Sequence, residues 1–376
     1  MENSSEFANI SGIFSNSTEA YPTSTEAYLK GAGNLVDKIC SPIIYVIGFP
    51  GNTVSLIIWM QKRMRHSSGY YLAALALNDL VFLFLQVLFE LETAWLMRVI
   101  SYPVMCQVFP TVYLATQCLS PYLVLAFTTE RYISICHPFK RESYCTVRRA
   151  KIVIACLIVF CLCTTCVNSY FYILLPVNGT SVYECHPRME VLEGENKSVF
   201  NVYSMCVEGL AFFLVPITIL VLNIFVIREM RRLSQMEQAH QHGSPSRTGS
   251  TTVMLLAVSF YQIITTLPVS IFYALRVQYQ MDPVYYFAQT IINEYGNTHY
   301  AFNIFIYLIT GKMFRQELKK LLLRPFRKLA STLPRDYSSL RTSIQASTKS
   351  KGTWVSINGK HNNGEKKEEK ASETLL

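Results

Sequence analysis

The sequence predicts an all-α membrane protein whose chain crosses the bilayer seven times. Three observations predict this class. The chain has 376 residues, of which 51% are hydrophobic and only 16% are charged, whereas a soluble domain carries about 25% charged residues. The apolar residues are gathered in long runs. Lys and Arg are concentrated in alternate loops between those runs.

Seven apolar runs of roughly 20–28 residues are long enough to span a membrane. They lie at residues 39–60, 70–91, 105–129, 151–175, 201–227, 252–275 and 284–309. Each run, as a helix rising about 1.5 Å per residue, could cross a hydrocarbon core of roughly 30 Å. The alternative is a large soluble protein with buried helices. It is disfavoured because seven such runs would leave hardly any polar surface.

The loop charges predict the orientation of the chain. The connections after the first, third, fifth and seventh runs are rich in Lys and Arg, and the opposite loops are poor in both. By the positive-inside rule, the N-terminus is then extracellular and the C-terminus cytosolic. This asymmetry accounts for the net charge of +9, so the charge does not call for a nucleic-acid partner.

The termini flank the helical region and differ from it in composition. We expect an extracellular glycosylated N-terminus at residues 1–38, a helical domain at 39–328 and a disordered Ser/Thr- and Lys-rich tail at 329–376. The first 39 residues contain no apolar stretch typical of a cleaved signal peptide. Five N-x-[ST] sequons all fall on the predicted outer side, which supports glycosylation there. They are Asn3, Asn9, Asn16, Asn178 and Asn196.

Three of the cysteines lie on the outer side, where the compartment is oxidising. Cys106 opens the third run and Cys185 lies midway through the long loop after the fourth. These two are therefore the expected disulfide pair. Cys40, at the outer end of the first run, is expected to remain a buried thiol.

Two adjacent charges, Glu130 and Arg131, end the third apolar run. Arg131 lies 25 residues after Cys106, which is about 37 Å of helix, a little more than the hydrocarbon thickness. If Cys106 lies at the outer surface, this pair lies at the inner one. A buried arginine that can change partners suits a conformational switch. Alternatively, Arg131 only extends its side chain from the membrane edge into water.

A set of motifs with consistent spacing resembles the rhodopsin-like G-protein-coupled receptors over all seven runs. The matching segments are Gly51-Asn52, LALNDL ending at Asp79-Leu80, Glu130-Arg131-Tyr132 followed by Pro138, Pro216, Pro268, Asn303-Ile-Phe-Ile-Tyr307 and Phe314–Leu318. The resemblance implies a seven-transmembrane helix bundle with a short amphipathic eighth helix that starts near Phe314. It also implies a plasma-membrane receptor, not an enzyme, that activates a heterotrimeric G protein. Arrestin is a further expected partner, through the Ser/Thr-rich tail.

The resemblance assigns coupling roles to six residues: Glu130, Arg131, Tyr132, Pro138, Asn303 and Tyr307. Several positions depart from the family pattern. Thr266 replaces the usual sixth-helix tryptophan, Ile304 replaces the proline of the seventh-helix motif, and Thr248 stands where many relatives have an acid that holds Arg131. We therefore expect a weak inactive-state latch and some activity without ligand.

Asp79 lies at mid-depth in the second run. By resemblance it joins Asn52, Ser120 and Asn303 in a polar cluster that holds a sodium ion in many relatives. The alternative is a hydrogen-bond network filled with water. His299 and Tyr300 stand where relatives have smaller polar residues. No other cofactor is expected.

Three further acids, Glu90, Glu208 and Glu294, lie on the outer halves of three runs. Ionisable groups inside a bilayer are rare and usually functional, and three carboxylates favour a cationic ligand group. The alternative is internal pairing, for which Arg276 is available. The resemblance places six more residues at the cavity wall: Tyr113, Gln117, Tyr273, Arg276, Gln289 and Asn293.

The sequence excludes some ligands and favours others. Tyr113 replaces the aspartate of amine receptors, and the seventh run contains no lysine for a retinal Schiff base. A long outer loop with acids and aromatics suits a peptide. HSSGYYLAALALNDL and SRTGSTTVMLLAVSF also resemble the invertebrate FMRFamide-type receptors and their orphan vertebrate relatives. The alternatives are a receptor of the same fold for a small non-peptide ligand, and a seven-span transporter.

Overall fold

A computed structural model of the chain describes residues 24–177, 182–192, 198–239, 247–279 and 282–332. The chain divides into two compact units, Met1–Leu318 and Lys319–Leu376, and the helical bundle belongs to the first. All five predicted glycosylation sites and most of the predicted tail lie outside the described residues.

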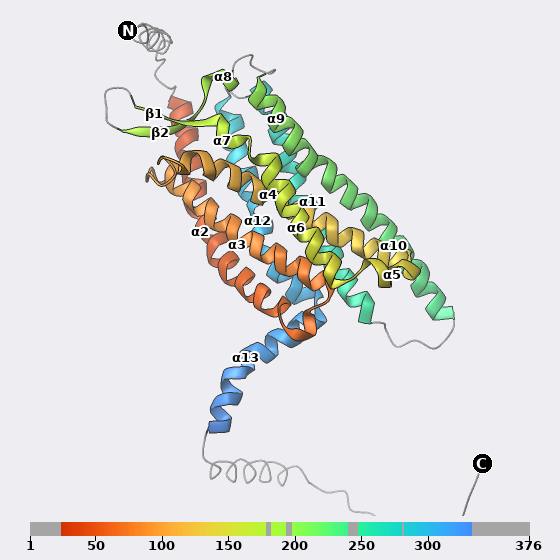
Figure 1. Ribbon diagram of the computed structural model, residues 1–376. Helices are drawn as coiled ribbons and strands as arrows, with labels where there is room; N and C mark the ends of the chain where they lie inside the picture. Colours follow the sequence, from red (N-terminus) through yellow and green to blue (C-terminus); the bar gives the residue numbers. More distant parts are fainter. Residues whose placement is uncertain (1–23, 178–181, 193–197, 240–246, 280–281, 333–376) are drawn as a thin grey trace, which may run out of the picture. The chain divides into compact units, whose positions relative to one another are not determined.

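Within the described residues, seven long helical segments form the bundle (Figure 1). They are α2 (Ser24–Trp59), α3 (Ser67–Thr93), α4 (Met105–Cys136), α6 (Val147–Thr165), the continuous segment α9 (Val199–Glu208), η3 (Gly209–Leu214) and α10 (Val215–Ala239), α11 (Arg247–Tyr279) and α12 (Pro283–Thr310). Helix α4 is central, because it packs against α3, α6, α10 and α11, while α2 lies between α3 and α12. The predicted seven-helix arrangement is confirmed.

Six of these segments are long and apolar enough to cross a membrane by composition alone. Helix α12 is the exception, because it carries polar residues such as Glu294, His299 and Asn303. All three side chains are at least 93% buried, and α12 packs between α2 and α11. Its polar face therefore lies inside the bundle rather than against lipid.

The fourth predicted run ends earlier as a helix than we expected. Helix α6 stops at Thr165, a short α7 (Asn168–Phe171) follows, and Tyr172–Pro176 forms strand β1. This strand pairs antiparallel with β2 (Tyr183–Pro187), so that Leu174 lies opposite Cys185. The expectation of a helix to residue 175 was wrong here. An apolar run does not by itself distinguish a strand from a helix, and pairing with β2 decided the outcome.

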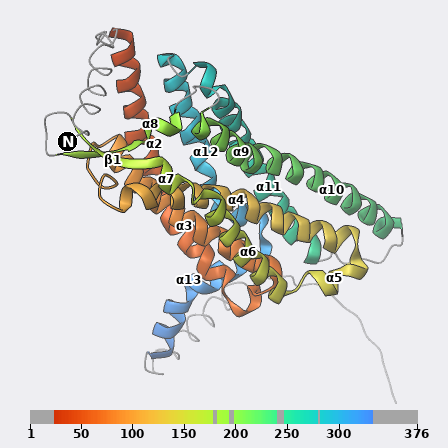
Figure 2. The same cartoon turned by 45° about the horizontal axis from the view of Figure 1, so that its top comes forward.

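Short elements mark the two ends of the bundle (Figures 1 and 2). The hairpin and α8 (Met189–Leu192) lie at one end, which we call the disulfide end. The turn η1 (Lys62–Met64), helix α5 (Pro138–Tyr144) and the start of α13 (Lys312–Thr332) lie at the other, which we call the arginine end. Helix α13 begins two residues before Phe314, where the eighth helix was predicted.

The core between the ends explains two glycines of α2. A Cβ atom on Gly48 would lie 2.5 Å from Leu83 Cδ1, and one on Gly51 would lie 3.0 Å from Ile304 Cγ2. The missing side chains therefore allow α2 to approach α3 and α12 closely. Ile44 and Phe82 pack in the same core, beside Tyr300.

Candidate functional site

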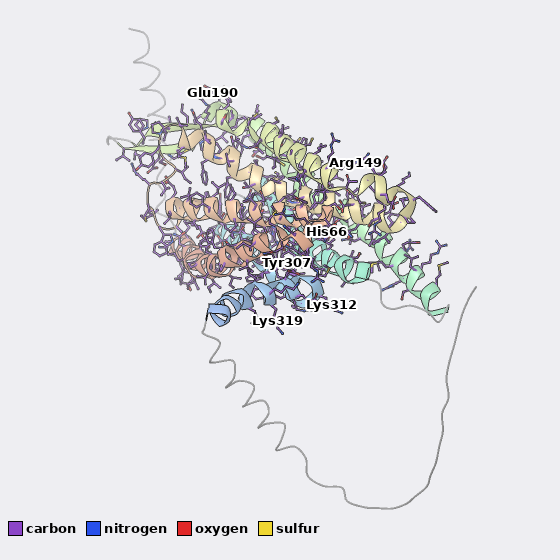
Figure 3. All side chains as sticks on the ribbon, turned by 60° about the horizontal axis from the view of Figure 1, so that its bottom comes forward. His66, Arg149, Glu190, Tyr307, Lys312 and Lys319 are labelled. Atoms are coloured by element: carbon purple, nitrogen blue, oxygen red, sulfur yellow. A yellow bond between two sulfur atoms is a disulfide. The ribbon has the colours of Figure 1, made fainter. Side chains whose placement is uncertain are left out.

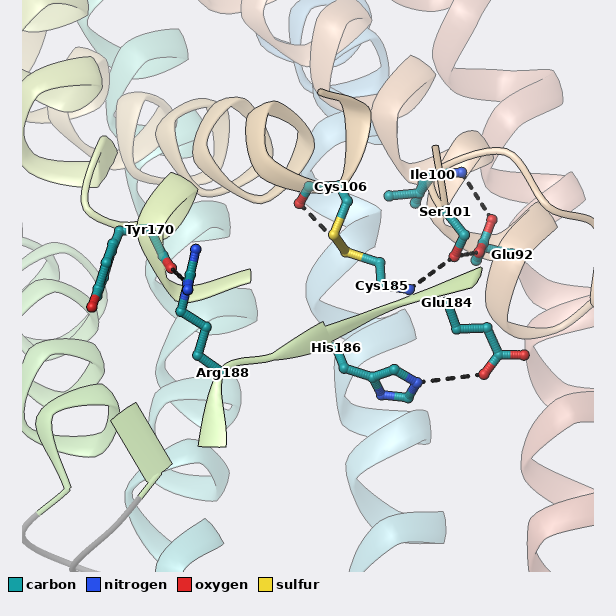
Figure 4. Close-up of a disulfide and its surroundings, with 9 residues drawn as sticks. All are labelled: Glu92, Ile100, Ser101, Cys106, Tyr170, Glu184, Cys185, His186 and Arg188. Atoms are coloured by element: carbon teal, nitrogen blue, oxygen red, sulfur yellow. Dashed lines mark hydrogen bonds and ion pairs between the residues drawn. A yellow bond between two sulfur atoms is a disulfide. The ribbon is translucent and has the colours of Figure 1, made fainter. Parts of the chain in front are cut away.

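The disulfide end is held by the bond between Cys106, in the first turn of α4, and Cys185 in β2 (Figure 4). Their Cα atoms are 5.5 Å apart. The backbone N–H of Cys185 also donates to Ser101 Oγ at 3.1 Å. The bond joins the pair expected from the sequence and holds the hairpin against the start of α4.

Glu92, near the end of α3, organises the connection to α4. Its carboxylate accepts the backbone N–H groups of Val99 and Ile100, at 2.5 and 2.9 Å, and the hydroxyl of Ser101 at 2.5 Å. The same Ser101 hydroxyl contacts Cys185, so the loop and the hairpin share one network (Figure 4). Sequence reasoning missed Glu92, since two of its three partners are backbone groups, which leave no pattern in the sequence.

Glu90 lies two residues before Glu92 on α3 and is 6% exposed. The side-chain amide nitrogen of Gln86, Nε2, donates to Glu90 Oε1 at 3.1 Å. The other amide atom of Gln86, Oε1, accepts the hydroxyl of Tyr113 on α4. Gln86 thus links one predicted acid to a predicted wall residue. The hydroxyl of Tyr45 on α2 is also buried beside Glu90.

Glu294 on α12 is 7% exposed and lies close to Glu90. Ser41 Oγ on α2 donates to Glu294 Oε2 at 3.1 Å, and Asn297 Nδ2 lies 3.5 Å from its Oε1. Ser41 is also within reach of Glu90, and Asp37 adds a third nearby carboxylate. Among the described side chains, no Lys or Arg pairs with Glu90 or Glu294. One hydroxyl proton cannot neutralise two buried carboxylates, so this cluster favours a cation.

The remaining predicted ligand residues divide into three groups. Tyr113 faces Tyr273 on α11 as well as the two acids, so the structure brings these side chains together. Gln117, Gln289 and Asn293 are half-buried. The side chain of Arg276 lies outside the described residues.

Glu208, the third predicted acid, has different neighbours. It ends α9 and lies beside Cys118 of α4 and Tyr203 of its own helix. Tyr203 in turn donates to the backbone oxygen of Thr164 on α6 at 2.9 Å. Glu208 therefore lies beside residues of α4 and of its own helix, and Tyr203 links that place to α6. The helical positions alone could not show these neighbours.

Asp79 is completely buried at mid-depth. Asn303 Nδ2 donates to its Oδ2 at 3.0 Å, whereas Asp79 Oδ1 and, on α4, the Oγ of the predicted ligand Ser120 are buried without a partner. Asn52, the fourth expected member, is used otherwise: its Nδ2 donates to the backbone oxygens of Gly48 and Tyr300. Through these bonds Asn52 fastens α2 to α12.

The arginine end contains the Glu130–Arg131 pair. Arg131 Nη2 lies 3.3 Å from Glu130 Oε1. The same oxygen accepts the hydroxyls of Ser67 and Ser68, at 2.6 and 2.8 Å, from the first turn of α3. Glu130 is buried, the side chain of Arg131 is 14% exposed, and Arg131 Nε has no partner. The serine hydroxyls therefore connect this pair to the start of α3.

His66 precedes α3 and lies close to this pair. Its Nδ1 accepts the backbone N–H of Gly69 at 3.0 Å, which caps the helix. Burial, and secondarily the positive charge of Arg131, lower the pKa of His66 below its usual value. Figure 3 labels His66 in a view that brings the arginine end forward.

Two other predicted residues frame α5. Tyr132 OH lies 3.4 Å from His137 Nε2, and Pro138 opens α5 at its first position. The next residue, Phe139, is fully exposed, although Lys140 and Arg141 follow it. Sequence reasoning missed Phe139. An apolar side chain inside a basic loop was the available signal.

Tyr307 ends the seventh-helix motif and is 1% exposed (labelled in Figure 3). Its ring lies edge to face against Trp59 of α2, with centroids 5.5 Å apart, and 5.2 Å from Phe314 of α13. Trp59 and Phe314 also contact each other. The three rings join α2, α12 and the first turn of α13, all within the first unit.

A family model described as "7 transmembrane receptor (rhodopsin family)" matches residues 51–307. The chain belongs to this family. The match runs from the close-packed Gly51 to the buried Tyr307, so it includes the Asp79 and Arg131 sites. The family match therefore identifies the chain as a rhodopsin-family receptor and not as a seven-span transporter.

Similar proteins within the family include receptors named for peptides. The FMRFamide receptor of Drosophila melanogaster is 25% identical over 285 residues, which cover 73% of this chain and 51% of the relative. Neuromedin-U receptor 2 of Mus musculus is 30% identical over 189 residues, 48% of this chain and 47% of the relative. Neuromedin-U receptor 1 of Homo sapiens is 30% identical over 228 residues, 57% and 51% respectively. The matched part of this rhodopsin-family receptor thus spans about half the length of each relative. The expected likeness to FMRFamide-type receptors is confirmed.

Proposed function

We propose that this receptor binds a peptide with a positively charged residue near an amidated C-terminus and activates a heterotrimeric G protein. In this proposal the disulfide end is extracellular, the arginine end is cytosolic and the protein resides in the plasma membrane. The positive-inside rule supports this orientation, because Lys and Arg gather in the loops of the arginine end. The peptide names of similar receptors support the ligand class.

The observation that carries the ligand proposal is the Glu90–Glu294 cluster. Two buried carboxylates from α3 and α12 share Ser41 and have no basic partner among the described side chains. An arginine of the ligand can bind a carboxylate with two hydrogen bonds, which are strong where water is excluded. A C-terminal amide would avoid bringing a further negative charge to the site.

The opposite end supplies the expected output. Ligand binding between α3 and α12 would favour a conformation in which Arg131 leaves Glu130 and a G protein enters at the arginine end. Phe139 offers an exposed apolar contact for that partner. We further propose that arrestin binds the Ser/Thr-rich segment 329–376.

The Asp79 site suits an allosteric sodium ion. Asp79 Oδ1 and Ser120 Oγ are buried oxygens without partners, and one cation would balance the single carboxylate. A bound sodium ion would supply positive charge at mid-depth, which Asp79, Ser120 and the amide oxygen of Asn303 would hold.

The experiment is a screen of amidated neuropeptides on cells that express the chain with a promiscuous G protein. Glu90→Gln or Glu294→Gln should raise the half-maximal concentration of the active peptide roughly 10- to 150-fold, because a charge-assisted contact contributes about 1.5–3 kcal/mol. The same variant should narrow the difference in half-maximal concentration between the peptide and its Arg→citrulline analogue, which the wild-type receptor should discriminate strongly. Glu190→Gln, on the exposed α8 of the same end, is the matched control. An acidic or uncharged activating ligand, or normal responses of both variants, would refute the proposal.

A further inference from the structure

A crevice on the outside of the bundle lies at the arginine end, away from the Glu90–Glu294 cluster. It has a volume of about 500 Å³, within the range of roughly 300–1,000 Å³ that is usual for small-molecule sites. We call it the α4–α6 crevice. Its wall is formed mainly by apolar residues of α4 and α6, including Leu125, Ile133, Ile152, Val153 and Leu157.

The crevice faces lipid. In α6 only Ala150, Cys161 and Thr165 are buried in the protein, while Ile152 and Val153 are 53% and 38% exposed. From Arg149 to Leu157 the wall extends over eight residues, which is about 12 Å of helix. A hydrocarbon chain lying along this wall would fill apolar space that side chains leave open.

The mouth of the crevice is basic. Arg149, in the first turn of α6, lies over the ring of Tyr144 with its Cζ 4.5 Å from the ring centroid, and both residues line the crevice (Arg149 is labelled in Figure 3). Lys151 lies over the Tyr70 ring nearby, at 4.9 Å. The N-terminus of α6 adds partial positive charge. A guanidinium held flat on an aromatic ring keeps its outer N–H groups available for a phosphate.

We propose that the α4–α6 crevice binds an anionic phospholipid of the adjacent leaflet, with one acyl chain between α4 and α6 and its phosphate at Arg149. This proposal rests on the proposed function only for the orientation that makes this leaflet the cytosolic one, where anionic lipids are concentrated. A neutral lipid would leave the basic mouth unused. A second copy of the chain would have to bring an anionic group to the same place.

The inner wall of the crevice would bring this lipid close to the Glu130–Arg131 pair. Glu130 lines the crevice, and Cys145 Sγ lies 3.6 Å from the Glu130 backbone oxygen. Burial, and secondarily Glu130, raise the pKa of Cys145, so this part of the wall carries a neutral thiol. An acyl chain would thus meet a neutral thiol at Cys145, beside the backbone of Glu130.

The test uses the full-length receptor in phosphatidylcholine nanodiscs that contain a phosphatidylserine probe with a diazirine on its acyl chain. Photolabels should map by mass spectrometry to residues 125–133 and 152–157. A phosphatidylcholine probe with the same chain should label these segments less. The probe enters both leaflets, so the result does not depend on orientation or on signalling.

Five variants separate the contributions of the acyl chain and the head group. Arg149→Gln should lower the preference for phosphatidylserine about fivefold, since one basic residue near a membrane surface contributes about 1 kcal/mol, and Arg149→Lys should keep most of it. Arg148→Gln, an exposed neighbour outside the crevice, is the charge control. Val153→Trp should fill the crevice and remove the label, whereas Ile158→Trp, exposed on the same helix outside the crevice, should not.

Several results would overturn the proposal. They are labels that map elsewhere in the wild-type protein, equal labelling by both probes, equal effects of Arg148→Gln and Arg149→Gln, or labelling that persists in Val153→Trp. Crosslinks between two copies of the chain at the crevice would identify a protein occupant instead. The wild-type map decides the outcome even if a variant is poorly folded.

Discussion

Arg131 is only loosely paired with Glu130, because 3.3 Å separates Arg131 Nη2 from the carboxylate oxygen, beyond the roughly 2.7–2.9 Å of a strong charge-assisted hydrogen bond. The same oxygen is engaged at shorter distances by Ser67 and Ser68. The serines offset part of the negative charge that would otherwise hold the arginine. Arg131 is therefore mostly covered but incompletely held, as expected of a group that changes partners.

Arg131→Ala should leave ligand affinity near the wild-type value and abolish G-protein activation. The variant removes the group that would be released toward the cytosolic partner. Ligand binding and nucleotide exchange measured at equal surface density test this, with the exposed Arg141→Ala as control. Undiminished exchange in Arg131→Ala would refute the coupling role.

Thr248 stands where an acid would help to hold Arg131, so we expect measurable activation without ligand. Thr248→Glu should lower that activity, and it should have no effect in an Arg131→Ala background, since the added acid would have no partner. Ligand-free exchange across G-protein subtypes is the measurement. A flat wild-type baseline in every subtype contradicts this prediction alone.

Cys185→Ser should reduce surface expression, ligand response or both. The disulfide closes a segment of 79 residues, and removing such a bond typically costs about 2–5 kcal/mol. Cys40→Ser, at a free and half-buried cysteine of the same end, should be tolerated. Mass mapping that found Cys106 and Cys185 as free thiols in surface-expressed protein would show the pairing to be wrong.

His66 should make the stability of the receptor depend on pH. Its pKa is lowered from the usual 6.5 in the folded state, so the unfolded chain takes up the proton first as the pH falls. Stability is then fully present above about pH 6.5 and decreases below it, by at most about 1.4 kcal/mol per pH unit. Thermal unfolding of purified receptor measures this. His66→Asn keeps a capping oxygen and should flatten the slope; an unchanged slope would exclude His66.

The sequence predicted the separate elements of the candidate site better than their mutual contacts. Cys106 and Cys185 could be paired from their positions because few outer cysteines were available. Glu90, Glu208 and Glu294 could be placed on the outer halves of helices by counting turns. Counting does not give helix rotation or neighbours, so it could not show that Ser41 lies at Glu294 or that Cys118 lies beside Glu208.

The sequence by itself determined the membrane class, the seven spans and the basic loops, because hydrocarbon thickness and charge asymmetry act on each segment locally. The family motifs are also local patterns, and they indicated Asp79 and Arg131 as candidate functional residues. Only the tertiary structure decided which side chains meet: Ser41 with Glu294, Ser67 with Glu130, Trp59 with Tyr307. It also determined that residues 172–176 form a strand and do not continue the helix. Such contacts join residues far apart in the chain, and they depend on how the helices pack rather than on any local pattern.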